Sequence, residues 1–299
     1  MDRQIAVDVP VFGVAFSPKG DAIYAVCADN KARVFSLNGG APLRTFAWDQ
    51  GDSNPTLTPH GLLTVGKDGA VKTWSFASGA VSSRFTPAGP RSRRSAVSAD
   101  GKLTASNVLP NPRYAETEVR VTDSTGNVKY SVPAGLGGLG AIAISPDGAS
   151  IVAASYDADV RAWKAANGEL LRLIDELQTA MFDLRFSPDG RYLAAAGAAR
   201  EVYIFDTKTW RLARKIPNLP QLVGALAFSG DGRLLATGGF EEITVQRPVK
   251  VIVWDFATAK PVRTVDAPHA VTGLALSPDG KLAAVAARER RIDLWQIPA

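Results

Sequence analysis

Short apolar segments follow one another along the whole chain and are separated by polar turn sequences. Apolar and small side chains fill residues 223–228, and shorter apolar runs occupy residues 192–196 and 202–205. Alternating or continuous apolar runs of about four to eight residues between turns are typical of β-strands. No window of the sequence has a sustained helical period, so the pattern predicts an all-β protein.

A four-residue turn sequence recurs along the chain at a nearly constant interval. It reads SPKG at 17–20, TPHG at 58–61, SADG at 98–101, SGDG at 229–232, and SPDG at 145–148, 187–190 and 277–280. The successive glycines are 41, 40, 47, 42, 42 and 48 residues apart. Proline and glycine favour a tight reversal of the chain, and each interval holds four short strand-like segments. We therefore predict a seven-bladed β-propeller with four antiparallel strands per blade, formed by residues 1–299 as a single domain.

The two ends of the chain are expected to share a blade. Residues 293–297 have the character of a third strand, so the last unit lacks an outer strand. Residues 4–7 are sufficiently apolar to supply it. We expect this N-terminal strand to close the last blade, because pairing removes an open sheet edge.

A large aromatic residue closes the third strand of six units. These residues are Phe35, Trp74, Trp163, Phe205, Trp254 and Trp295, and Thr122 stands at the same place in the third unit. Trp254 and Asp255 form a literal Trp-Asp pair. Six residues before the aromatic position the units carry Asp29, Asp68, Asp157, Glu116, Glu289, Ala199 and Pro248.

With the turn sequences, these positions resemble the WD-repeat (tryptophan–aspartate) propeller family over the whole chain. The chain is a divergent member by this resemblance, since the Gly-His pair typical of the family is absent. The resemblance implies an Asp–His–Ser/Thr–Trp hydrogen-bond tetrad, which we expect to be incomplete here.

Two units are longer than the others, and the surplus lies between the second and third strands. The insertions fall around residues 107–118 and 240–250, on what we call the top face of the ring, opposite the SPDG-type turns. Insertions on one face can mark a binding surface. Neutral variation of loop length explains them equally well.

The composition limits the kinds of functional site that the chain can form. Hydrophobic residues make up 46% and charged residues 21% of the 299 positions, which excludes disorder as the main state. The single Cys27 cannot form an internal disulfide and lies in an apolar run typical of a buried strand. His60 and His269 are expected on opposite faces, so we predict no metal site. The sequence also contains no GxSxG nucleophile motif, and we predict no cofactor and no catalytic residue.

The glycine-rich stretch at 135–140 precedes a strand rather than a helix. We therefore interpret it as a flexible top loop rather than a phosphate site.

Basic residues gather near the two insertions. Such groups can bind phosphate or acidic peptides, although a solvated surface with interspersed acids is the simpler interpretation. If the chain binds a partner on its top face, we expect contacts from Arg91, Arg93, Arg94, Arg113, Arg247, Lys250, Arg288, Arg290 and Arg291. The top acids Asp49, Asp52, Asp175 and Glu176 separate these groups, so the top face is not the basic platform that nucleic acid requires.

The net charge of +5 has a structural explanation as well. The predicted outer strands carry basic residues at similar points, where they discourage edge-to-edge pairing. These residues are Arg3, Arg44, Arg84, Lys129, Arg172, Arg214, Lys215 and Arg263.

The function we expect is a non-enzymatic scaffold that binds a protein or peptide on the top face. The alternative is a propeller enzyme or small-ligand binder that uses the central channel, similar to lactonase or quinoprotein propellers, with carboxylates such as Asp183 as candidates. We expect a monomer that binds neither nucleic acid nor membrane. With no apolar run long enough for a leader or a transmembrane helix, a cytoplasmic location is expected. The abundance of alanine suggests a bacterial source.

Overall fold

The protein is described by a computed structural model, in which strands and turns account for all regular structure. The described residues are 2–47, 53–58, 61–65, 71–75, 81–85, 94–108, 116–175, 177, 179–240, 248–287 and 289–298. No helix occurs among them, and hence none that could cross a membrane. The prediction of an all-β protein is confirmed.

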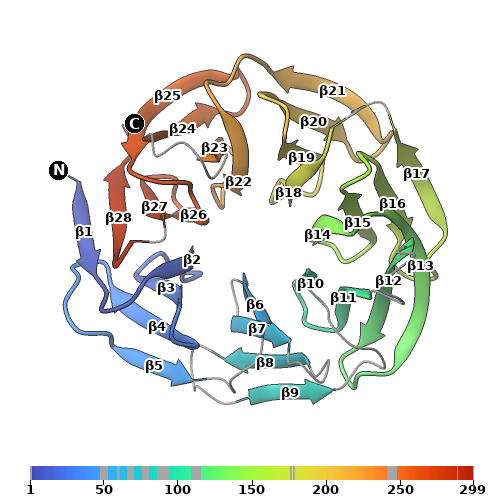
Figure 1. Cartoon of the computed structure of the whole chain (residues 1–299), viewed down its shortest axis with the longest axis horizontal. Helices are drawn as coiled ribbons and strands as arrows, with labels where there is room; N and C mark the ends of the chain where they lie inside the picture. The colour runs from blue at the N-terminus through green and yellow to red at the C-terminus, as the bar shows by residue number, and fades with distance from the viewer. Residues whose placement is uncertain are drawn as a thin grey trace. The chain divides into compact units, whose positions relative to one another are not determined.

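The described strands pair into four-stranded antiparallel sheets, which are labelled in Figure 1. The strands of the first four sheets in chain order are β2 (Val11–Phe16), β3 (Ala22–Cys27), β4 (Lys31–Ser36) and β5 (Arg44–Ala47); β6 (Ser53–Thr58), β7 (Gly61–Val65), β8 (Val71–Ser75) and β9 (Val81–Phe85); β10 (Ser95–Val97), β11 (Leu103–Val108), β12 (Glu116–Asp123) and β13 (Val128–Leu136); and β14 (Leu139–Ile144), β15 (Ser150–Ser155), β16 (Val160–Lys164) and β17 (Leu170–Ile174). The others are β18 (Met181–Phe186), β19 (Tyr192–Gly197), β20 (Val202–Asp206) and β21 (Arg211–Ile216); β22 (Leu222–Phe228), β23 (Leu234–Phe240), β24 (Val249–Asp255) and β25 (Lys260–Ala267); and β26 (Gly273–Leu276), β27 (Leu282–Ala286), β28 (Arg291–Gln296) and β1 (Arg3–Ala6). This arrangement is consistent with a β-propeller.

The first and last strands of the chain belong to one sheet. β1 pairs antiparallel with β28, and Ile5 stands opposite Ile292. Ile5 is 1% exposed and packs in a hydrophobic cluster with Ile292 and Leu294. The N-terminal strand therefore completes the last sheet, as the sequence predicted.

The chain divides into two compact units by its internal contacts. One consists of residues 1–48, 200–202 and 215–299, and the other of residues 49–199 and 203–214. In the first unit β22, β26 and β2 contact one another in turn, and in the second β6, β10, β14 and β18 do the same. Within each unit, consecutive sheets therefore pack through their first strands.

The core lies between neighbouring sheets and is rich in small residues on the second strands. Ala194, Ala195 and Ala196 of β19 are fully buried, as are Ala153 and Ala154 of β15. Small side chains on a strand that is covered on both faces allow the sheets to approach closely, and larger residues such as Met181 and Phe205 fill the space that remains. The alanine content is thus explained by packing.

The recurring turn has the same geometry in every described copy. In the copy at 187–190, the Gly190 N–H donates to the Ser187 carbonyl at 2.8 Å, and Gly190 adopts φ 72°. The Ser187 hydroxyl donates to Asp189 Oδ1 at 2.5 Å and accepts from the Tyr192 N–H at 2.9 Å. The left-handed φ favours glycine, and the hydroxyl satisfies the strand that follows. Equivalent serine contacts are made by Ser98, Ser145, Ser229 and Ser277. The Ser17 hydroxyl donates instead to Asp21, which follows the turn glycine, because Lys19 stands at the aspartate position.

The glycine-rich stretch at 135–140 differs from its prediction. β13 extends to Leu136 and β14 begins at Leu139, so only Gly137 and Gly138 form the connection. A Cβ on Gly140 would overlap the Met181 carbonyl oxygen. The glycine is required by close approach of β18 within the sheet stack, and the expected flexible loop was wrong.

Candidate interaction surfaces

The strands of each sheet reverse direction at two opposite ends of the sheet. We call the end with the serine-containing turns the lower edge. We call the end with the second-to-third-strand turns and the connections to the next sheet the upper edge. The sequence predicts binding at the upper edges, so these are described first.

Two large apolar side chains are exposed at the upper edges of sheets β10–β13 and β14–β17, near the connection between these sheets. Tyr156, in the turn after β15, is 47% exposed, and Leu136 at the end of β13 is 59% exposed. The Tyr156 N–H donates to the Gly138 carbonyl at 3.0 Å, and a Cβ on Gly138 would lie 3.6 Å from the tyrosine ring. Tyr156 thus lies over a connection that carries no side chains. Neighbouring exposed apolar groups of this kind are typical of binding surfaces.

Hydrogen bonds hold this edge in place from below. Asp157 Oδ2 accepts from the Leu136 N–H at 2.6 Å, and Asp157 Oδ1 accepts from the Asp159 N–H at 3.2 Å. Asp159 in turn pairs with Arg161 at 2.7 Å. The acidic residue that precedes the aromatic position by six therefore fixes the turn and the incoming strand together.

Gly135 lies against polar atoms in the same region. Its φ is 111°, and a Cβ there would lie 2.6 Å from both Arg161 Nη1 and Ser155 Oγ. These two atoms are buried without a hydrogen-bond partner among the described residues. The position therefore accepts glycine alone, which explains one of the glycines that the sequence pattern left without a role.

The corresponding turn between β3 and β4 holds an ion pair. Arg33 donates to Asp29 through Nη1 at 2.9 Å and Nη2 at 2.6 Å. These hydrogen bonds lower the pKa of Asp29 and raise the pKa of Arg33. Cys27 nearby is 2% exposed, and burial raises the pKa of its thiol. A buried thiol with a raised pKa is a poor nucleophile, in agreement with the prediction that Cys27 serves packing.

The described members of the predicted basic set are divided between the two compact units. Arg94 is exposed in the unit of residues 49–199 and 203–214, and its N–H donates to Asn107 Oδ1 at 2.7 Å. Lys250, Arg290 and Arg291 belong to the other unit, where Lys250 pairs with Asp266 at 2.6 Å and Arg291 with Asp293 at 3.1 Å. Arg290 is exposed, and its carbonyl accepts from the Val7 N–H. Arg91, Arg93, Arg113, Arg247 and Arg288 lie outside the described residues.

The described part of the chain contains few other groups that could form a metal site or a catalytic site. No group of three or more His, Cys, Asp or Glu side chains there could hold a metal ion. Asp183, on the first strand β18, pairs with Arg185 at 3.3 Å and accepts from the Leu184 N–H at 2.9 Å. His269 Nε2 lies 3.0 Å from Glu289 Oε1, and His60 falls outside the described residues.

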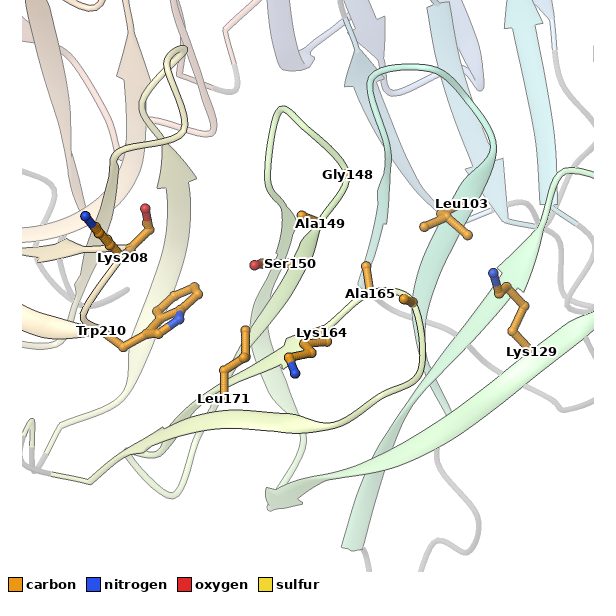
Figure 2. A pocket seen from close by; sticks show the side chains of 12 residues that line it. Leu103, Lys129, Gly148, Ala149, Ser150, Lys164, Ala165, Leu171, Lys208 and Trp210 are labelled. Carbon is orange, nitrogen blue, oxygen red and sulfur yellow. The ribbon is translucent and has the colours of Figure 1, made fainter.

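The lower edges of sheets β10–β13, β14–β17 and β18–β21 share a groove of about 560 Å³ (Figure 2). Its walls combine apolar side chains such as Leu171 and Trp210 with three lysines, Lys129, Lys164 and Lys208. The sequence analysis predicted binding on the opposite edge or, as the alternative, in a central channel, and it did not identify this groove. The lysines are far apart in sequence, and only the unusual tryptophan in a turn could have drawn attention to it.

Four-stranded antiparallel sheets that repeat with a serine-anchored turn are consistent with a protein of the β-propeller type. The family model described as "WD domain, G-beta repeat" matches residues 130–164, 172–206 and 259–296. The chain therefore contains WD repeats, and the predicted resemblance to that family is confirmed. WD repeats generally mediate protein interactions. No curated protein was found whose sequence matches the chain.

The tetrad implied by the family is split between two sheets. Trp254 Nε1 donates to Thr237 Oγ1 at 3.0 Å, which is the tryptophan–threonine link, while Pro248 occupies the acidic position of that unit. The acid–histidine link is present as Glu289–His269 in the next sheet. There Val285 stands opposite Asp293, the place that Thr237 takes in its own sheet. Neither repeat contains both links. The tetrad is therefore incomplete in each, as expected from the divergent sequence pattern.

Proposed function

We propose that the chain is a non-enzymatic interaction module that binds a protein or peptide partner through upper-edge loops. In this proposal the four-stranded sheets are the blades of one seven-bladed propeller spanning residues 1–299. The observation that carries the proposal is the exposed pair Tyr156 and Leu136, supported on a connection without side chains and tied by Asp157.

A preorganised apolar surface favours binding. Tyrosine supplies a large contact area at a small cost in conformational entropy, because its side chain has only two rotatable bonds. The hydrogen bonds beneath Tyr156 hold the turn before any partner arrives, so little affinity is lost to ordering the protein.

The predicted arginines have a supporting role in this proposal. Arg94 belongs to the same compact unit as Tyr156 and is exposed, as a contact to an acidic partner side chain requires. We include Arg91 and Arg93 with it, since all three stand in one short segment. The proposal therefore predicts an apolar anchor on the partner, with acidic groups beside it.

The test is quantitative affinity capture followed by measurement of the dissociation constant for the captured partner. We expect the double variant Leu136→Ala/Tyr156→Ala to weaken binding at least tenfold. We expect the triple variant Arg91→Ala/Arg93→Ala/Arg94→Ala to weaken it less, by about threefold to tenfold, because exposed charges contribute more to encounter than to affinity.

The matched control is Leu43→Ala, which removes a 63% exposed apolar side chain beside β5 in the other unit. It should leave the dissociation constant unchanged. Equal affinity of the wild-type chain and the Leu136→Ala/Tyr156→Ala variant, with both folded by circular dichroism, would overturn the proposal.

A further inference from the structure

The groove at the lower edge combines a hydrophobic floor with cationic ends. Leu171 and Trp210 lie in its middle and at one end in Figure 2, and Leu103 lies toward the other end. Lys208 lies near Trp210, and Lys129 lies near Leu103. All these residues belong to one compact unit, so the groove does not depend on how the two units are placed.

The carboxylates near the groove direct their oxygens to groups other than Lys129 and Lys208. Asp147 accepts from the Ser145 hydroxyl at 2.5 Å and the Ala149 N–H at 2.9 Å. Asp206 accepts from the backbone N–H groups of Lys208 and Thr209. Glu169 pairs with Lys164 at 2.8 Å. In the described part of the chain, the ammonium groups of Lys129 and Lys208 make no comparable ion pair, and both side chains are exposed.

The tryptophan at the end of the groove is held in an unusual backbone conformation. Trp210 has φ 53°, and its N–H donates to the Asp206 carbonyl at 2.7 Å. The equivalent turns place Gly168 and Ala259 there, with φ 76° and 55° and the same hydrogen bond. A bulky residue at positive φ is strained, and such strain gathers at functional positions. The indole covers the groove floor where the other turns have almost no side chain.

Exposed apolar residues continue along the outer strands of the same three sheets. Val128, Leu170 and Leu212 stand at or near the starts of β13, β17 and β21 and are 45%, 52% and 43% exposed. Each of the three sheets that line the groove therefore also exposes an apolar side chain on its outer strand. Large exposed apolar residues on adjacent elements are typical of sites that bind another protein.

We propose that this groove is a second docking site, independent of the upper-edge surface, for an acidic segment of a partner protein. An apolar side chain of the segment would lie against Leu171 and Trp210. Flanking carboxylates would meet the ammonium groups of Lys129 and Lys208. Charge complementarity selects this occupant, because the groove offers an apolar floor and two exposed ammonium groups that form no ion pair among the described residues.

The experiment selects peptides and then measures them. A display library of random peptides about 12 residues long is selected on the full chain, with the variant Lys129→Glu/Lys208→Glu as the counter-selection. We expect enriched peptides that carry Asp or Glu on both sides of a Leu, Ile or Phe. The consensus peptide, labelled with fluorescein, should bind the double variant at least tenfold more weakly in an anisotropy titration, and raising the salt should weaken its binding to the wild-type chain.

Three controls distinguish the groove from general charge attraction and from folding defects. Lys19→Glu reverses an exposed cation of the other unit and should not change the affinity. Leu136→Ala/Tyr156→Ala should not change it either, which separates this proposal from the upper-edge proposal. Thermal unfolding must show that Lys129→Glu/Lys208→Glu remains folded, and Lys129→Ala/Lys208→Ala serves as the milder second variant.

Enrichment of neutral or basic peptides, or equal affinity of the consensus peptide for the wild-type chain and both lysine variants, would overturn the proposal. A single-stranded oligonucleotide that displaces the peptide with higher affinity would overturn it as well, because the groove would then take a phosphate backbone.

Discussion

At the scale of single residues, the serine of the recurring turn is the most consequential polar side chain. Ser187 is 2% exposed, and its hydroxyl bonds both Asp189 and the Tyr192 N–H. Removing it leaves a buried backbone donor without a partner, which costs more than the hydrogen bond itself contributes. The turn sequence was readable from the primary structure because it needs proline or glycine at fixed places, whereas the serine's double contact was not.

We expect Ser187→Ala to lower the free energy of unfolding by about 1–2 kcal/mol. Urea denaturation followed by tryptophan fluorescence measures the change. Ser124→Ala, at an exposed turn position, is the matched control and should lie within about 0.5 kcal/mol of the wild type. A Ser187→Ala variant as stable as the control would contradict this account of the turn.

The aspartates of these turns make stability depend on pH. The Ser98 hydroxyl and the Lys102 N–H lower the pKa of Asp100 to about 2, and similar serine and backbone hydrogen bonds lower the pKa values of Asp147, Asp189 and Asp279. A carboxyl whose folded pKa is below its unfolded value of about 3.9 adds stability above that value. The added stability is lost as the pH falls through the folded pKa.

Urea midpoints should therefore be nearly constant from pH 7 to about pH 5 and should fall steeply from about pH 4 to pH 2. Asp189→Asn removes one of these carboxyls, so its midpoint should fall less over the same interval. Parallel pH profiles of the wild type and Asp189→Asn would show that the turn carboxylates do not cause the acid sensitivity.

At the scale of elements, the strand that joins the two ends of the chain carries the clearest prediction. Ile5 of β1 is 1% exposed and packs with Ile292 and Leu294 of β28. The pairing could be anticipated from the apolar character of residues 4–7 and the missing fourth strand of the last repeat, whereas its register and its bounds, Arg3–Ala6, could not. The glycine stretch at 135–140 could not, since its role depends on the Met181 carbonyl of another strand.

Ile5→Ala should lower the free energy of unfolding by about 2–5 kcal/mol, because it leaves a cavity against β28. The substitution Gln4→Ala, at an exposed position on the same strand, should have little effect. Chemical denaturation measures both variants. Equal stability of the two would mean that β1 does not contribute to the core.

At the scale of the whole molecule, charge is distributed differently from what composition alone suggested. The outer strands carry exposed basic residues such as Arg44, Lys129 and Arg172, as the period predicted. On the upper edges, however, the described lysines and arginines are often paired, as Lys250 is with Asp266. Whether a lysine or arginine forms an ion pair within the protein depends on acidic side chains from distant strands. The sequence could therefore indicate basic segments, but not which of their side chains remain able to contact a partner.

The exposed apolar residues, unlike the basic segments, could not be identified from the sequence. Tyr156 and Leu136 were not singled out by the sequence, because a tyrosine in a turn and a leucine between glycines are common in buried positions as well. Their exposure follows from the connection between β13 and β14, whose glycines leave the tyrosine ring uncovered. The central claim therefore depends on two residues that became evident only in three dimensions.

Hydrogen–deuterium exchange on the complex with a captured partner tests that claim most directly. We expect slower exchange at residues 133–140 and 155–159 on binding, with the turn at 187–190 unchanged. Unchanged exchange in the first two segments at saturating partner would contradict the assignment of the upper edge as the binding surface.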